Sequence, residues 1–389
     1  MTGSDVFPHE EMAARLARVR GAMVADGVGA CLVMAPESQL WLSGLESFIS
    51  GVLPQTLIVP AEDDRPLMLV VWDADVPLAR ATGIVEEIRG YRFGVDDPIS
   101  AFKAGLEACA PGVDVIGVDG ASRAVPHAFG AALVEGLAPA RCVDCSALLA
   151  DARLVKSERE LECLRRAGDY ANAGLSAALK YARPGVTERE LAAEIEYAMR
   201  RAGSDYPSIP TELASGSRSA LVHGTPSHRV LEAGDLVHLE IGGVERRYNA
   251  VGLQTFHVGG ASVPAAGAHL YDIARACLRA GLDAIHPGIE AHEVEAPALA
   301  ILGSAGLVDG FKMRFGYGVG VGYPPTWLDP LQITRTSAQR LLPGATFVLH
   351  ACLLDEDSSI GVVVGGTYAI GERGVEVLAG AGPAGLVTV

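Results

Sequence analysis

The feature of this 389-residue sequence that most constrains its fold is an internal repeat in the second half. Two Pro-Gly turns, Pro184-Gly185 and Pro287-Gly288, each separate the end of one helical pattern from the start of another, and they lie 103 residues apart (287 − 184). Sequence typical of β-strands follows each copy, over residues 236–258 and 346–370. Two copies of a helix-pair-plus-strands unit predict an α+β domain with a pseudo-twofold axis and a cleft near that axis.

Short apolar runs alternate with amphipathic segments over the first 150 residues, as is typical of an α/β domain. The runs expected as strands are 30–34, 56–59, 67–71 and 115–118, and the segments expected as helices are 10–26 and 99–109. A longer amphipathic stretch follows, in which Ser157 and Glu160 have the spacing of a capping box at the start of a helix. We therefore predict an N-terminal α/β domain over residues 1–152 and a second domain over 153–389.

Composition and charge disfavour several classes of protein. Apolar residues make up 49% of the chain and charged residues 20%, as in an ordinary globular enzyme. The formal net charge of −16 repels phosphate backbones and anionic lipid heads, so we expect no nucleic-acid partner and no membrane association. The opening segment is acidic where a secretory signal needs a basic start, and no apolar run reaches the roughly 18 to 20 residues of a membrane span. We expect a cytoplasmic protein.

Several short motifs in the second half occur in the order of a known family. They are Arg183-Pro-Gly-Val-Thr-Glu-Arg-Glu-Leu at the first helix junction, Ala214-Ser-Gly followed by His223-Gly, and Gly234-Asp-Leu-Val followed by Glu240-Ile-Gly. In this order they resemble the creatinase and aminopeptidase P family, and the match covers about residues 152–380. The resemblance implies that the second domain has the duplicated "pita-bread" fold of that family. It also implies a twofold homodimer, because the relatives complete the pocket with the N-terminal domain of a neighbouring subunit.

The metal ligands of the metallopeptidase members are mostly replaced in this sequence. Those members bind two metal ions through two Asp, one His and two Glu, because hard divalent cations need several anionic oxygens. The resemblance places the five ligand positions on Glu240, Val251, Tyr317, His350 and Gly365. Only the first and the fourth still carry coordinating side chains, so we expect no functional metal and no other cofactor.

Creatinase and ectoine hydrolase, in the same fold, cut C–N bonds of small cationic or zwitterionic molecules without a metal. The run from Gly316 to Trp327 most resembles the ectoine hydrolase branch, which also carries a Glu at the position of Glu240. The leading hypothesis is therefore a metal-independent hydrolase of a C–N bond in a small amidine, amide or cyclic amino-acid derivative, with a zwitterionic or cationic substrate. Two alternatives remain open: a metal-free lyase or isomerase acting by proton abstraction, and a non-catalytic binding homologue of the metallopeptidases.

Four residues are predicted to be catalytic. The resemblance places His223 at the family's proton-shuttling position, where imidazole can take and give a proton near neutral pH. Glu240 lies in an apolar strand, where burial raises a carboxyl pKa, and is predicted as base or nucleophile, with a structural carboxylate as the alternative. Tyr317 is predicted to donate to a developing oxyanion. His350 is predicted to bind a substrate carboxylate or to pair with Glu240, and a hydrogen-bonded core histidine is its alternative.

Aromatic and charged residues near these positions are predicted to bind the substrate. Tyr248, Tyr323 and Trp327 are candidates for a wall that stacks on a substrate cation, although aromatic residues at this spacing also occur as plain packing. The candidate charge partners for a zwitterionic substrate are Glu212, Arg218, Arg314 and Arg335.

Overall fold

The computed structural model describes residues 7–372, 374–380 and 385–389, and the chain divides into two compact units, Met1–Arg153 and Leu154–Val389. This division falls one residue beyond the end expected for the first domain. The first six residues, with which the acidic opening segment begins, lie outside the described residues. None of the described helices combines the length and the apolar character that crossing a bilayer requires.

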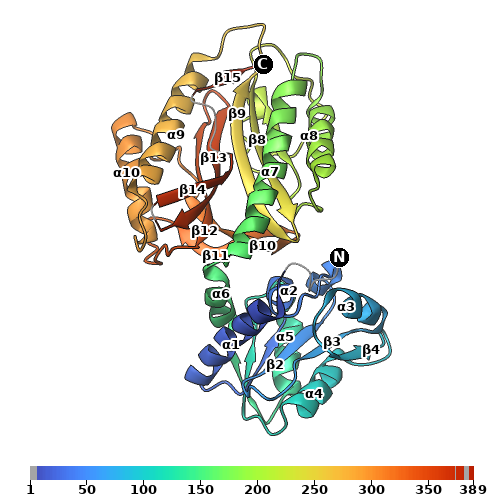
Figure 1. Ribbon diagram of the computed structural model, residues 1–389. Helices are drawn as coiled ribbons and strands as arrows, with labels where there is room; N and C mark the ends of the chain where they lie inside the picture. Colours follow the sequence, from blue (N-terminus) through green and yellow to red (C-terminus); the bar gives the residue numbers. More distant parts are fainter. Residues whose placement is uncertain (1–6, 373, 381–384) are drawn as a thin grey trace. The chain divides into compact units, whose positions relative to one another are not determined.

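The first unit contains a mixed six-stranded sheet with the order β4-β3-β2-β1-β5-β6, in which β1 pairs antiparallel with β2 and parallel with β5 (Figure 1). Its strands are β1 (Ala30–Val33), β2 (Thr56–Pro60), β3 (Met68–Trp72), β4 (Glu87–Tyr91), β5 (Val115–Val118) and β6 (Arg141–Asp144). Its helices are α1 (His9–Ala25), α2 (Pro36–Ser43), α3 (Val76–Thr82), α4 (Pro98–Cys109), α5 (His127–Gly136) and α6 (Ser146–Leu154), with 3-10 turns η2 (Phe48–Gly51) and η3 (Asp73–Asp75).

Helices cover both faces of this sheet. Successive residues of each strand point to opposite faces, so one strand contributes side chains to a buried cluster on each side. Leu57 and Val59 of β2 belong to a buried cluster with Trp41 of α2, whereas Ile58 belongs to a second cluster with Phe102 of α4. The predicted α/β class of the N-terminal domain is confirmed.

The second unit contains a nine-stranded sheet whose main path is β11-β10-β12-β13-β9-β8-β7, with β14 paired to β13 and β15 paired to β9. Its strands are β7 (Glu212–Ser215), β8 (Leu236–Glu245), β9 (Tyr248–His257), β10 (Gly316–Tyr323), β11 (Thr326–Ile333), β12 (Thr346–Asp355), β13 (Ile360–Gly371), β14 (Gly374–Ala379) and β15 (Val387–Thr388). Its helices are α7 (Glu158–Tyr181), α8 (Glu188–Ala202), α9 (Ala265–Ala284) and α10 (Ala291–Ala305), with the 3-10 turn η4 (Gly216–Arg218).

The helix positions confirm the internal repeat. Helices α8 and α10 begin and end 103 residues apart (291 − 188 and 305 − 202), and α7 and α9 end 103 residues apart (284 − 181). Gly185 and Gly288 have φ of 94° and 85°, a left-handed conformation that favours glycine, so both copies turn in the same way. The capping box predicted for α7 is present, since the Ser157 side chain accepts from the Glu160 amide at 3.2 Å and the Glu160 carboxylate accepts from the Ser157 amide at 2.9 Å.

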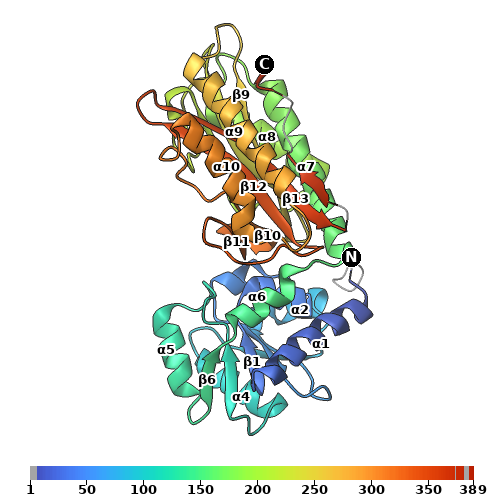
Figure 2. The ribbon, with the colours of Figure 1, turned by 90° about the vertical axis from the view of Figure 1, so that its left-hand side faces the viewer.

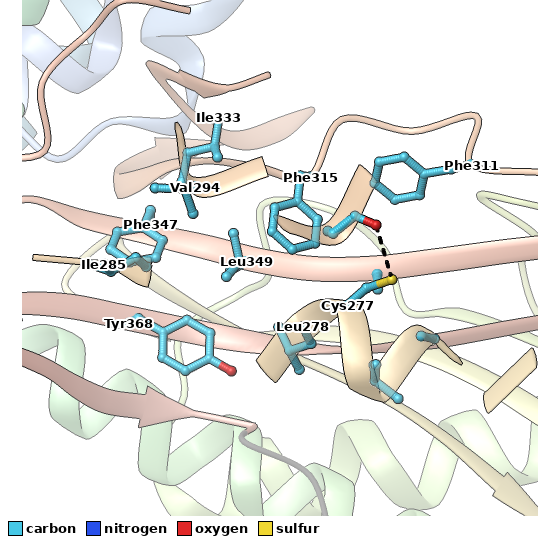
Figure 3. Packing of buried hydrophobic residues seen from close by; sticks show 14 of the residues in the cluster. Cys277, Leu278, Ile285, Val294, Phe311, Phe315, Ile333, Phe347, Leu349 and Tyr368 are labelled. Atoms are coloured by element: carbon cyan, nitrogen blue, oxygen red, sulfur yellow. Dashed lines mark hydrogen bonds between the residues drawn. The ribbon is translucent and has the colours of Figure 1, made fainter. Parts of the chain in front are cut away.

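Both helix pairs pack on one face of the central strands. Val237 and Leu239 of β8 lie in a buried cluster with α7 and α8, and Phe347 and Leu349 of β12 lie in a cluster with α9 and α10. Figure 2 shows α9 and α10 in front of β12 and β13, and Figure 3 shows Phe347 beside Ile285 and Leu349 beside Phe315 in the cluster that these helices cover. The cross-strand register places these strand residues on the same face. Alternate residues of the same strands therefore point away from the helices.

Candidate active site

The residues that point away from the helices form a row across the sheet. Glu212 of β7 pairs with Glu240 of β8, which pairs with Leu253 of β9. Leu253 pairs with Gly365 of β13, which pairs with His350 of β12. Directly paired residues of antiparallel strands point to the same face. The fold therefore brings Glu240, His350 and Gly365 onto one surface, as the resemblance implies, and adds Glu212 to it.

An apolar floor lies between these polar groups. One buried cluster on this face contains Val251, Leu253, Tyr317, Val319, Trp327, Val348, Cys352 and Val363. The five positions that the resemblance assigns to family metal ligands thus lie on one face, and two of them, Val251 and Tyr317, are part of the floor. Apolar surroundings disfavour the charged form of any carboxyl group above them.

Tyr317 and Trp327 hold the carboxyl group of Glu240. The Tyr317 hydroxyl lies 3.0 Å from Glu240 Oε1, and the Trp327 indole Nε1–H donates to the Tyr317 hydroxyl at 3.1 Å. An indole nitrogen only donates, so the Tyr317 oxygen is the acceptor there and its own proton is directed to Glu240. The hydroxyl predicted as an oxyanion donor is therefore engaged in positioning the carboxyl group.

The carboxyl groups of Glu212 and Glu240 are both shifted toward the protonated form. Burial raises the pKa of Glu212, and the negative charge of Glu240 raises it further. Burial also raises the pKa of Glu240, while the Tyr317 hydrogen bond and the Arg314 charge oppose that rise. The Arg314 guanidinium carbon lies 5.5 Å from the centroid of the Tyr317 ring, so this arginine belongs to the site.

His350 is a neutral imidazole within the site. Its ring centroid lies 5.8 Å from that of Tyr317, and burial lowers its pKa to about 3. Its Nδ1 atom is buried and has no hydrogen-bond partner in the part of the chain that the structure describes. A neutral imidazole binds a substrate carboxylate by hydrogen bonding and not by charge. If His350 binds such a group, as predicted, it therefore does so as a hydrogen-bond donor.

His238 is a site residue that the sequence reasoning missed. It lies two residues before Glu240 on β8 and therefore on the same face. Burial lowers its pKa to about 4, and its Nδ1–H donates to the Ser219 carbonyl at 3.3 Å, which leaves Nε2 as an acceptor. The signal was present in the sequence, because Val237-His-Leu-Glu places two polar residues at the spacing of one strand face.

His223 lies on the loop between β7 and β8 and is exposed. Its Coulombic interaction with His238 and His350 contributes to the lowered pKa values of those two residues, so it lies near both rings. Within the described ranges it forms no hydrogen bond to Glu240, so the structure lacks the direct contact that a two-residue mechanism would use.

Glu188, at the start of α8, holds the loop that carries His223. It is fully buried, and one oxygen accepts from the Ser215 amide and hydroxyl, both at 2.8 Å. The other accepts from the Ser227 amide at 2.9 Å and hydroxyl at 2.6 Å. The loop is thus fixed at both ends by one carboxylate.

Two of the three predicted aromatic wall residues lie elsewhere. Tyr248 pairs with Glu245 on the helix-facing side, and its hydroxyl donates to Glu160 of α7 at 2.8 Å. The Tyr323 ring lies 5.0 Å from the guanidinium of the buried Arg247. The predicted wall is therefore not formed by these residues, and only Trp327 is part of the site.

Of the four charged candidates for substrate binding, two lie at the site and two make contacts elsewhere. Arg335 is half exposed and pairs with Glu295 of α10 at 3.4 Å, away from the row, and Arg218 contacts the Glu188 carboxylate. The structure thus removes Arg335 from the predicted substrate-binding set. Glu212 and Arg314 remain at the site.

Two family models match the chain. Residues 15–155 match the Creatinase/Prolidase N-terminal domain, and residues 162–377 match Metallopeptidase family M24. The chain belongs to metallopeptidase family M24. The family predicted from the sequence motifs is confirmed, and the M24 match contains every site residue named above.

Known relatives of this M24 chain differ in how much of their length they share with it. The Xaa-Pro dipeptidase of Pyrococcus horikoshii is 34% identical over 174 residues, which are 45% of this chain and 49% of the relative. The chain thus matches about half the length of this relative. The ectoine hydrolase of Halomonas elongata is 26% identical over 393 residues, which are 96% of each protein.

Solved structures confirm the pita-bread fold. A prolidase from Pyrococcus horikoshii OT3 superposes with a TM-score of 0.83 at 23% identity, covering 95% of this chain and 99% of that chain. An Xaa-Pro dipeptidase from Bacillus anthracis superposes with a TM-score of 0.85 at 22% identity, covering 97% and 100%.

The residues at the M24 metal positions do not fit a metal centre of the family type. A carboxylate at position 365 has no room, because a Cβ atom on Gly365 would lie 2.6 Å from the His350 Cβ and 2.5 Å from the Leu349 carbonyl oxygen. Among the described residues no three His, Cys, Asp or Glu side chains converge as a metal site. Without bridging carboxylates, two divalent cations cannot be held at the distance that a dinuclear mechanism needs.

The raised pKa of Glu212 predicts a characteristic pH dependence of stability. A carboxyl group that holds its proton more tightly when folded stabilises the fold at low pH, and that contribution is lost as pH rises above the ordinary glutamate pKa of about 4.3. Glu212→Gln cannot ionise, so its free energy of unfolding should exceed that of the wild type by about 1 to 3 kcal/mol at pH 9, at about 1.4 kcal/mol for each pKa unit, and show no such gain at pH 4. Urea unfolding at both pH values measures this. A gain independent of pH, or equal to that of Glu194→Gln on α8, would contradict it.

Proposed function

We propose that this M24 member is a metal-independent hydrolase of a C–N bond in a small amidine, amide or cyclic amino-acid derivative. The observation that carries the proposal is the Glu240 carboxyl group, which the Tyr317 hydroxyl holds above an apolar floor at the positions that the resemblance assigns to metal ligands. A carboxyl group with a raised pKa is a general base suited to proton transfer near neutral pH.

In the proposed reaction, ionised Glu240 accepts a proton from water while the water oxygen attacks the electrophilic carbon. The C–N bond then breaks, and the leaving nitrogen takes that proton from the Glu240 carboxyl group. Water is thereby added across the bond, with oxygen on carbon and hydrogen on nitrogen. Tyr317, fixed by Trp327, orients the carboxylate, and the exposed His223 exchanges protons between the site and solvent.

The relatives support this proposal in two ways. The sequence similarity to ectoine hydrolase extends over nearly the whole length of the chain, whereas the sequence similarity to the Xaa-Pro dipeptidase of Pyrococcus horikoshii extends over about half. The side chains at the metal positions also favour a reaction that uses a carboxyl base, because Val251 and Gly365 offer no donor atom for a metal.

Labelled water provides the test. The protein is incubated with ectoine, creatine and an Xaa-Pro dipeptide in water enriched in oxygen-18. We expect product carrying the label from one of the first two compounds, no cleavage of the dipeptide, an unchanged rate in EDTA, and less than one equivalent of zinc, manganese or iron per chain. Unlabelled product would instead favour the lyase alternative, and dipeptide cleavage abolished by EDTA would reject the proposal.

A further inference from the structure

Two buried thiols meet in the first unit, outside the site described above. Cys31 lies on β1 and Cys145 directly follows β6, and β5 runs between these two strands. Both side chains belong to the same buried cluster, with exposed fractions of 0% and 3%. All seven cysteines of the chain are free thiols, so Cys31 and Cys145 are a reduced pair.

A glycine on β5 makes room for the two sulfur atoms. Gly117 pairs with Cys31 on one side and with Val143 on the other, and Cys145 follows Val143 by two residues, on the same face. A Cβ atom on Gly117 would lie 2.7 Å from Cys31 Sγ and 3.2 Å from Cys145 Sγ. The two sulfur atoms therefore fill the space that a side chain at position 117 would need.

The two side chains are within reach of a covalent bond. The Cys145 Cβ lies 3.0 Å from the Cβ position of Gly117, the residue paired with Cys31. Neighbouring strands are about 4.8 Å apart, so the two side chains begin about one strand spacing from each other, within the range that a disulfide spans. The hydrogen bond between the two thiols, together with burial, raises the pKa of Cys145. The packing of the core thus holds the two thiols in contact.

The sequence alone indicates a different pair. Cys142 and Cys145 have the Cys-x-x-Cys spacing of redox motifs. Cys142, however, packs against the cluster on the opposite face of the sheet, the one that contains Phe102. The sheet therefore separates the thiol of Cys142 from that of Cys145, and Cys145 faces Cys31 instead.

We propose that Cys31 and Cys145 form a reversible disulfide when the protein meets hydrogen peroxide. The Cys145 thiolate attacks one peroxide oxygen and becomes a sulfenic acid, and the departing hydroxide takes up the thiol proton and leaves as water. The Cys31 sulfur then displaces the hydroxyl group from the Cys145 sulfur, which forms the S–S bond and releases a second water. Two thiols and one peroxide thus give one disulfide and two waters, and two electrons pass from sulfur to peroxide.

The end of β6 provides access for the oxidant. This short strand stands at the edge of the sheet, and its first and last residues, Arg141 and Asp144, are exposed. Such a strand opens locally more readily than a central strand, and Cys145 immediately follows it. Because both thiols are buried in the closed form, the reaction should be slower than that of an exposed thiol. The cross-link joins residues 114 positions apart (145 − 31) and restricts the unfolded chain, so it should stabilise this unit.

Mass spectrometry of the full-length protein after treatment with hydrogen peroxide tests the inference. We expect the folded wild type to lose two of its seven thiols, to become lighter by the mass of two hydrogen atoms, and to yield one pair of peptides joined through Cys31 and Cys145. Dithiothreitol in urea should restore all seven thiols. The oxidised protein should also unfold at a higher urea concentration than the reduced protein.

Cys142→Ser is the matched control, because its thiol lies on the other face of the sheet, and this variant should form the same disulfide as the wild type. Cys31→Ala should form no internal disulfide, and circular dichroism verifies that it is folded. The inference is overturned by a disulfide between Cys142 and Cys145, by a folded wild type that keeps all seven thiols, or by an oxidised protein less stable than the reduced one. None of these results depends on whether the second unit is a hydrolase.

Discussion

Replacing Glu240 with Gln is expected to lower turnover by roughly two to four orders of magnitude while leaving the fold intact. The amide has the same shape and can still accept the Tyr317 hydrogen bond, so the loss isolates the ability to take a proton. Turnover is measured on whichever compound of the ectoine and creatine pair the wild type hydrolyses, and the unfolding transition is measured beside it.

Glu245→Gln is the control for this substitution, because Glu245 lies on the same strand but faces the helices and accepts from Tyr170 at 2.9 Å. It should retain near-wild-type turnover. If Glu240→Gln also retains it, Glu240 is not the base, and the binding-homologue or lyase hypothesis takes precedence.

Replacing Glu188 with Ala is expected to destabilise the protein by about 3 kcal/mol, because the substitution removes the acceptor of several hydrogen bonds and leaves buried Ser215 donors unpaired. The same carboxylate fixes both ends of the loop that carries His223, so turnover should fall even at temperatures where the variant is folded. Urea unfolding measures the stability, and hydrogen exchange of residues 216–226 measures the order of the loop.

Glu194→Ala controls for loss of a glutamate from α8, since Glu194 forms no hydrogen bond or ion pair with any described residue and its removal should cost less than about 0.5 kcal/mol. Equal stability of the two variants, or wild-type hydrogen exchange in the loop of Glu188→Ala, would show that the carboxylate does not organise this segment.

The sequence was sufficient to predict the class of fold and to predict which strand residues of the second unit lie together at the site. The 103-residue offset marks a duplication that helices α7 to α10 reproduce, and it depends on local signals such as the Pro-Gly turns. Glu240, His350 and Gly365 were placed together through their motifs, and the strand register joins them in one row.

Side-chain direction could not be predicted for the aromatic and charged candidates. Tyr248 lies in β9, the strand next to that of Glu240, yet its side chain points to the helix side. The register of the β8–β9 hairpin pairs it with Glu245, which faces the helices. Arg335 is paired with a glutamate on a helix 40 residues earlier in the chain, a contact that no local pattern reveals. The position of Glu212 beside Glu240 depends on the pairing of β7 with β8, which the sequence alone does not reveal.

Gly365 and His350 also bear on how this chain could change over evolutionary time. Because the space that a carboxylate at position 365 would need is occupied by the strand that carries His350, a substitution at either position alone cannot create a pair of metal ligands. Several coordinated replacements would be required, each offering little before the others are in place. Packing between β12 and β13 therefore keeps a carboxylate out of position 365 unless the two strands shift relative to each other.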